Sequence, residues 1–396
     1  MQLILKLIAG ILGGILLGLF APDALIRALL TFKELFGQLL FFTIPLLILF
    51  YITAGIAGLP KASGHLLGRT IGTAYASTIL AGIMAFLIAA VVIPLLATAG
   101  GTAPVEEGSA LEPFLRMDIP PVLSIMSALA TAFIFGLGIA ATSATTLKSV
   151  FEEGRDVIEK LLITVIIPLL PFYIAGVFAE LAAAGTVFET LKTFGIVLLL
   201  SVALHWVWIG VLYSLAGMKS GRSPLSLIKN MLPAYVTALG TMSSAATIPV
   251  TLRCARNNSV REDIASFSIP LCATVHLAGS TITIVSCAVA VMVLSDGLAM
   301  PSLMTMLPFI FMLGLVMLAA PGVPGGAVMA AVGLLGSMLG FDETAIALMI
   351  ALYMAQDSFG TACNVTGDGG IAVLVDSAAS EGALSGADEE KQTVAR

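Results

Sequence analysis

The chain has 396 residues, of which 59% are hydrophobic and only 11% are charged, and its formal net charge is -6. Because soluble proteins carry about a quarter of their residues as Asp, Glu, Lys and Arg, this composition excludes an ordinary soluble enzyme and argues against a nucleic-acid partner. Four dispersed cysteines without a CxxC pair indicate neither a disulfide framework nor a zinc site.

Eight apolar stretches are long enough to cross the roughly 30 Å hydrocarbon layer of a membrane as helices, at residues 3–21, 32–59, 67–97, 119–147, 158–183, 190–217, 262–294 and 343–375. The first is followed at once by another span, which is not typical of a secretory signal. With both termini in the cytoplasm, every Lys and Arg is cytoplasmic except Arg27, Lys33, Arg116 and Lys192. This distribution obeys the positive-inside rule and predicts a multi-pass protein of the cell inner (plasma) membrane.

Residues 1–217 contain the first six of these spans, and none of them places a convincing charge at bilayer depth. We expect this half to be mainly scaffold. His205, in the sixth span, is expected to be an ordinary packed or interfacial histidine.

The second half contains two apolar stretches that are interrupted by small residues and proline, Ile228–Cys254 and Pro301–Leu339. Irregular backbone is tolerated at membrane depth only where it is buried in protein or lines a cavity, so both are candidate re-entrant hairpins. The alternative is a pair of kinked ordinary helices. Each candidate hairpin precedes a full span, and such internal repetition is typical of secondary transporters.

The last span carries a polar stripe in the stretch DSFGTACNVTGDGG (357–370). At 100° per residue, Asp357, Thr361, Asn364 and Asp368 share one narrow helix face over about 16 Å. Ionisable groups inside a membrane usually mark ion or substrate paths; the alternative is a polar seam that bonds helix to helix. Two acids without a basic residue in the span favour cation binding, and Gly369 and Gly370 are expected to let the helix loosen and expose carbonyls.

Four motifs of the second half resemble those of the dicarboxylate/amino acid:cation symporters, the glutamate transporter homologues. They are SSAATIPVT (243–251), PLCATVHLAGS (270–280), GVPGGA (322–327) and NVTGD (364–368). The resemblance implies an all-α fold with eight transmembrane helices plus two re-entrant helical hairpins, assembled as a homotrimer with an elevator mechanism. It assigns residues 1–217 mainly to the trimerisation scaffold, residues 218–376 to the transport core, and residues 377–396 to a polar cytoplasmic tail. Spans 3 and 6 are alternatively part of the moving transport domain.

The resemblance also implies roles for individual residues. Asp357 matches the acid that holds a substrate ammonium group, and Asn364 matches the amide that binds its α-carboxylate. The remaining substrate positions are Thr361, Gly360, Ser280, the first hairpin tip Ser243 and Ser244, and the second tip Gly322, Val323, Pro324 and Gly325, which acts as a lid and contributes carbonyls to another sodium site. A sodium site is implied at Asp368, with oxygen atoms from Asn364, His276, Thr274 and Leu277.

Two departures from the family pattern change the expected substrate and ions. In acidic-substrate members an arginine stands at the position of Gly360, and members usually carry another at the position of either Met242 or Ser358. Without these cations, burying an unpaired second carboxylate would cost several kcal/mol. His276 and Ala278 replace an asparagine and a sodium-binding aspartate, so fewer Na⁺ sites are expected. His276 either couples protons as a titratable substitute for that site or fills a dry gap, bonded to Tyr75 or Thr78.

The expected function is cation-coupled uptake of small neutral amino acids, with Na⁺ as the coupling ion and no organic cofactor. The same-fold alternative is a symporter of dicarboxylates or other organic anions, with protons as a further coupling option. An enzyme is not expected, because no nucleophile is paired with a base, and the interrupted helices favour alternating access over a channel. Membrane lipid is the other expected partner; the choice among alanine, serine, threonine and larger neutral substrates is open.

Overall fold

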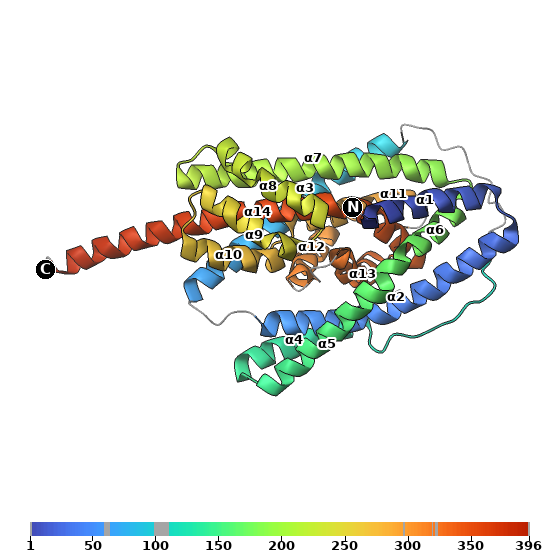
Figure 1. The fold of residues 1–396 in the computed structure, drawn as a ribbon, viewed down its shortest axis with the longest axis horizontal. Coiled ribbons are helices and arrows are strands. Elements are labelled where there is room, and N and C mark those ends of the chain that lie inside the picture. The colour runs from blue at the N-terminus through green and yellow to red at the C-terminus, as the bar shows by residue number, and fades with distance from the viewer. Residues whose placement is uncertain are drawn as a thin grey trace. The chain divides into compact units, whose positions relative to one another are not determined.

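The structure, a computed structural model, describes residues 2–58, 64–98, 111–295, 298–318, 320 and 324–394. Every regular element in these ranges is a helix (Figure 1), so the all-helical prediction is confirmed for the described residues. In chain order the helices are α1 (Gln2–Phe20), α2 (Asp23–Ala57), α3 (Gly64–Thr98), α4 (Ile125–Thr142), α5 (Thr145–Leu161), the π-helical turn η1 (Leu162–Ile166), α6 (Ile167–Ala183), α7 (Val187–Ser220), α8 (Pro224–Thr241), α9 (Ser244–Asn257), α10 (Glu262–Val275), α11 (Ala278–Leu294), α12 (Leu303–Met317), α13 (Gly326–Leu339) and α14 (Glu343–Val394).

In the part of the chain that the structure describes, six helical stretches are long and apolar enough to cross a membrane: Asp23–Ala57, Leu66–Leu96, Thr145–Ala183, Val187–Ser220, Glu262–Leu294 and Glu343–Ala379. They coincide with six of the eight predicted spans. The other two, at 3–21 and 119–147, correspond to the shorter apolar helices Leu5–Phe20 and Met126–Thr142. The stretch 119–147 is shortened because Pro120 and Pro121 precede α4 and because Ser143, with φ 54°, ends it in the left-handed region.

The helices divide into two compact units, each assembled from separate parts of the sequence. The first unit contains Met1–Leu59, Gly82–Ser201 and Ile282–Asp357; the second contains Pro60–Ala81, Val202–Thr281 and Ser358–Arg396. The boundaries fall within α3, α7, α11 and α14, so these helices contribute to both units. The predicted roles of residues 1–217, 218–376 and 377–396 in transport stay predictions.

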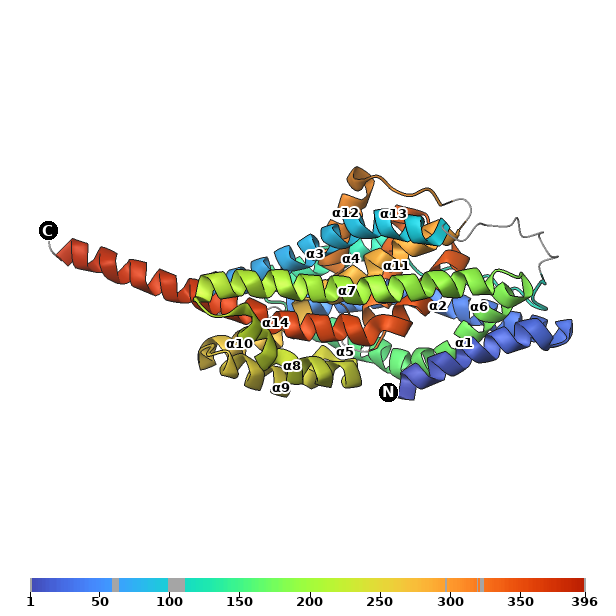
Figure 2. The ribbon, with the colours of Figure 1, turned by 90° about the horizontal axis from the view of Figure 1, so that it is seen from above.

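In the first unit, α1 lies alongside α6 (Figures 1 and 2). Gly10, Gly14 and Gly18 repeat every fourth residue of α1, and a Cβ atom at any of them would overlap a backbone carbonyl of α6. Helices in a lipid environment associate chiefly by close packing, which small residues at this spacing allow. The glycines of α1 therefore position this helix against α6.

Both candidate hairpins consist of two short helices. In the second unit, α8 packs against α9 (Figure 2), and in the first unit α12 packs against α13. Helices α9 and α13 have 14 residues each, which is about 21 Å of helix and less than the hydrocarbon thickness. Met242, with φ 52°, separates α8 from α9; the packing of the two halves favours a hairpin over one kinked helix.

Candidate functional site

The predicted polar stripe lies on α14, and all four of its side chains are buried. Asp357, Thr361, Asn364 and Asp368 are 4%, 6%, 3% and 1% exposed. Helix α14 continues without a break to Val394, through the segment that was expected to be a polar tail. Four buried polar side chains on one face exclude an ordinary lipid-facing helix.

The prediction that α14 loosens at Gly369 and Gly370 is wrong, because the helix is continuous there. The glycines instead allow close packing. A Cβ at Gly369 would lie 2.6 Å from Met231 Cε and 2.8 Å from Tyr213 Oη, and one at Gly370 would lie 3.1 Å from Leu212 Cγ. Side chains of α7 and α8 therefore occupy the space that any larger residue would need.

In the first unit, both oxygens of Asp357 accept hydrogen bonds from neutral donors. The Gly325 backbone N–H donates to Oδ2 at 2.8 Å, and the Tyr353 hydroxyl donates to Oδ1 at 2.9 Å. Gly325 adopts φ +75°, and a Cβ there would lie 2.6 Å from Met354 Sδ, so this position requires glycine. Of the predicted tip residues, Pro324 and Gly325 are described, whereas Gly322 and Val323 lie outside the described residues.

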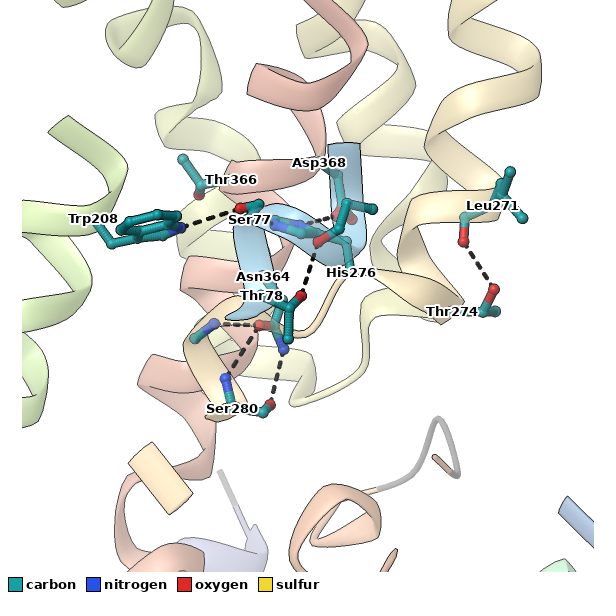
Figure 3. A network of polar contacts seen from close by, with 12 residues as sticks. Ser77, Thr78, Trp208, Leu271, Thr274, His276, Ser280, Asn364, Thr366 and Asp368 are labelled. Atoms are coloured by element: carbon teal, nitrogen blue, oxygen red, sulfur yellow. Dashed lines mark hydrogen bonds and ion pairs between the residues drawn. The ribbon is translucent and has the colours of Figure 1, made fainter. Parts of the chain in front are cut away.

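In the second unit, the predicted span 262–294 is broken at His276. Helix α10 ends at Val275 and α11 begins at Ala278, with His276 at φ -111° and ψ 93°. Asn364 bridges the break (Figure 3): its Oδ1 accepts from Gly279 N at 2.8 Å and from Ser280 N at 3.2 Å, and its Nδ2 donates to Ser280 Oγ at 2.9 Å. The predicted span 262–294 is thus found as a long apolar stretch, with a break at His276 as an additional feature.

His276 joins Asp368 to Ser77 in a buried polar chain (Figure 3). Its Nδ1 lies 3.0 Å from Asp368 Oδ1, its Nε2 lies 2.9 Å from Ser77 Oγ, and Trp208 Nε1 donates to the same Ser77 oxygen at 3.3 Å. Because Trp208 can only donate, the Ser77 proton is free to go to His276 Nε2. The imidazole then donates Nδ1–H to Asp368.

The expected partners of His276 need a correction. We expected Tyr75 or Thr78 to bond to the imidazole, but Ser77 does so. The Thr78 hydroxyl donates to Ala74 O of its own helix, 3.0 Å away. A Cβ at Gly367 would lie 2.5 Å from His276 Cε1. Glycine at position 367 therefore makes room for the imidazole.

The residues around the break fit a hard cation by their oxygen chemistry. In a continuous helix, Gly279 N–H and Ser280 N–H would bond to the carbonyls of Val275 and His276, so Asn364 releases these carbonyls by accepting both N–H groups. A carboxylate together with such carbonyls suits Na⁺. Within the described residues, His, Cys and carboxylate side chains form no cluster of three or more, so a cation here would depend on backbone oxygens and on Asp368.

The other predicted site residues occupy well-defined places in the second unit. Ser243 is the N-cap of α9 and accepts from Ala246 N at 3.3 Å, and Ser244 is the first residue of that helix. The Thr274 hydroxyl donates to Leu271 O at 2.8 Å (Figure 3), and Leu277 O accepts from Thr281 N at 2.9 Å. The Thr274 side chain is thus engaged within its own helix.

Three residues of the site did not emerge from the sequence: Ser77 and Tyr353, which bond directly to His276 and Asp357, and Trp208, which bonds to Ser77. Only Tyr353 had a local signal, because it stands four residues before Asp357 and therefore on the same helix face. His205 was expected to be ordinary, yet its Nε2 lies 3.0 Å from Gly279 O at the helix break. All four cysteines are free and buried.

The model of the sodium:dicarboxylate symporter family matches residues 3–378. The chain is also similar to the serine/threonine transporter SstT of Streptococcus suis (strain 05ZYH33), with 34% identity over 301 residues that cover 72% of this chain and 81% of the relative. Both matches are transporters rather than enzymes. With a family model that matches almost its whole length, the chain belongs to the sodium:dicarboxylate symporter family.

Proposed function

We propose that the protein is a secondary active transporter that takes up small neutral amino acids together with Na⁺. The observation that carries this proposal is the environment of Asp357, whose buried carboxylate is bonded to a backbone N–H and a phenol. Within the described residues, no basic side chain forms an ion pair with it. Because an unpaired buried charge is costly, an ammonium group brought by the substrate would supply the missing positive charge.

The α-carboxylate of the substrate is assigned to Asn364 and to the start of α9. Asn364 Nδ2 has two protons and gives one of them to Ser280, which leaves one N–H for a carboxylate oxygen. Ser243 and Ser244 stand at the N-terminus of α9, where backbone N–H groups favour an anion. Thr361 and Ser280 are the proposed hydroxyl ligands.

The proposed specificity for neutral side chains depends on Gly360, Met242 and Ser358. None of these residues can pair with a second carboxylate, so glutamate and aspartate would bury an unpaired charge. The similarity to a protein named a serine/threonine transporter supports a substrate of this size. We therefore expect neutral L-amino acids, but not glutamate or aspartate, to raise the thermal unfolding temperature of the purified protein; a larger rise with aspartate than with serine would contradict the assignment.

The proposed coupling ion is Na⁺, in agreement with the sodium named in the family description. Asp368 and the backbone carbonyls around Asn364 and His276 would hold it, with fewer sites than in members that keep the aspartate at the position of Ala278. Bound Na⁺ would offset the charge of a buried carboxylate. The imidazole already donates to one oxygen of Asp368, which leaves the other oxygen for an ion.

The second candidate function is symport of a dicarboxylate or another organic anion, because the family description names dicarboxylates. In this function the Asp357 carboxylate would face a negatively charged substrate that has no ammonium group, which is electrostatically unfavourable. Succinate and malate in the same thermal panel test it: stabilisation by these acids, together with no effect of serine, would favour this function over amino-acid uptake.

For the membrane arrangement, we propose eight transmembrane helices, two re-entrant hairpins and a homotrimer in the plasma membrane, with both termini cytoplasmic and an elevator mechanism. The six long apolar helices and the short helix pairs α8–α9 and α12–α13 support this arrangement. The close packing of α1 against α6 is compatible with a rigid scaffold.

Uptake by proteoliposomes tests the proposed function directly. The purified protein is reconstituted, and accumulation of radiolabelled serine, threonine, alanine, glutamate and succinate is measured with an inward Na⁺ gradient and with choline in place of Na⁺. We expect the gradient to drive accumulation of the neutral amino acids. Equal uptake in choline would contradict Na⁺ coupling, and accumulation of succinate alone would contradict the amino-acid assignment.

A further inference from the structure

The proposed function gives Asp357 a role but assigns none to Tyr353, which forms a buried pair with it on α14. The Tyr353 side chain is among the largest fully buried ones, and its hydroxyl donates to Asp357 Oδ1 at 2.9 Å across one helical turn. The Tyr353 hydroxyl reaches Asp357 only because the surrounding side chains leave room for the whole buried ring. The burial of both groups indicates a built contact rather than a chance surface bond.

The contact acts on the orientation of the carboxylate. The Asp side chain has a broad energy profile about its last torsion, so a single donor, the Gly325 N–H on Oδ2, leaves the carboxylate plane free to turn about that bond. A second donor on Oδ1 removes this freedom. An ionised carboxylate offers about four lone-pair sites, so with two of them occupied, those that remain point in fixed directions.

The contact also favours the charged form of Asp357, because both neighbours are donors and a carboxylate is an acceptor. Hydrogen bonds to an ionised group are roughly twice as strong as neutral ones. Among the described residues bonded to Asp357, only Tyr353 contributes a side chain. Its hydroxyl is therefore the one donor that a substitution can remove without changing the backbone.

We propose that Tyr353 is a positioning residue for substrate recognition, which holds the Asp357 carboxylate ionised and turned toward the ammonium group of an amino acid. This inference rests on the proposed function, because it assumes that Asp357 receives that ammonium group. A purely structural alternative is that the ring of Tyr353 only fills space in the first unit. Phenylalanine separates the two, because it keeps the ring and removes the hydroxyl.

The test compares Tyr353→Phe with Tyr173→Phe and with the wild type in proteoliposomes. Tyr173 is also a buried tyrosine of the first unit, and it makes no contact with Asp357 in the described structure. For Tyr353→Phe we expect the KM for serine to rise about tenfold, the scale of a lost hydrogen bond to a charged group. The maximal rate and the Na⁺ half-saturation at saturating serine should stay at wild-type values, and Tyr173→Phe should leave the KM unchanged.

Each outcome of this experiment is decisive. A wild-type KM in a folded Tyr353→Phe variant, or an equal rise in Tyr173→Phe, would overturn the inference and leave the proposed function intact. Failure of the wild type itself to bind or transport any amino acid would instead contradict the proposed function. If Tyr353→Phe cannot be purified in folded form, Tyr353→His and Tyr353→Met replace it: His, which retains a ring N–H donor, should keep a lower KM than Met, and equal values would overturn the inference.

Discussion

Asp357 and Asp368 are buried carboxylates on one helix face, yet their neighbours differ. Asp357 accepts hydrogen bonds from a backbone N–H and a phenol hydroxyl. Asp368 instead bonds to an imidazole nitrogen of His276, whose other ring nitrogen bonds to Ser77. The donors to the first carboxylate, an amide N–H and a phenol, are both neutral near pH 7, whereas the second has an imidazole neighbour, which can carry a positive charge. This difference agrees with separate roles, one toward the substrate and one toward the coupling ion.

At the first of these residues, we expect Asp357→Asn to abolish amino-acid binding while leaving the fold intact. The neutral amide loses the charge that would balance a buried ammonium group, a change of about 3 to 5 kcal/mol on the scale of a broken buried pair. Isothermal titration calorimetry with serine measures the loss, and unfolding without substrate is the control. Wild-type affinity in the variant would refute the role of Asp357.

For the second carboxylate, Asp368, we expect substitution by Asn to weaken the Na⁺ dependence of uptake more than any other property of transport, because hard cations prefer an ionised oxygen. Serine uptake is measured over a series of Na⁺ concentrations at a saturating serine concentration. An unchanged Na⁺ half-saturation in the variant would mean that Asp368 is not a ligand of the coupling ion.

Among the elements, the contact of α14 with the break between α10 and α11 depends on Gly367, which leaves room for the His276 ring. We expect Gly367→Ala to destabilise the protein by about 1 to 3 kcal/mol, the usual cost of overpacking, because the ring must leave Asp368 or Ser77. Gly210→Ala is the matched control, since a Cβ there meets nothing within 4 Å. Thermal unfolding in detergent compares the two, and equal stability would show that the ring yields without cost.

The presence of the long apolar helices and the polar face of α14 were predictable from the sequence, because both depend on local hydrophobicity and on a 3.6-residue period. The break at His276 was not predictable in this way. Its N–H groups are satisfied by Asn364, which is more than 80 residues away in the chain, and Ser77 and His276 are separated by 199 residues. A sequence pattern carries no information on such partners, whereas Tyr353 could have been found by counting one turn back from Asp357.

For the whole molecule, the substitution of the family's aspartate by Ala278 predicts a low ratio of Na⁺ to substrate. A methyl group cannot coordinate an ion, and His276 now donates to Asp368. We expect Ala278→Asp to steepen the Na⁺ dependence of uptake, and Ala278→Asp with His276→Asn to steepen it further. Reversal potentials in proteoliposomes give the ratio directly, and a wild-type ratio no lower than that of members that keep the aspartate would mean that other groups replace the lost ligand.

The burial of Cys254, Cys272, Cys287 and Cys363 has a practical consequence for following this molecule at work. Water-soluble maleimides need an accessible thiolate, so the native chain should stay almost unlabelled while folded. A single cysteine introduced at an exposed position then reports its own accessibility without prior removal of native thiols. Reagents applied from one side of a sealed vesicle can in this way follow which surfaces face each compartment as Na⁺ and substrate are added.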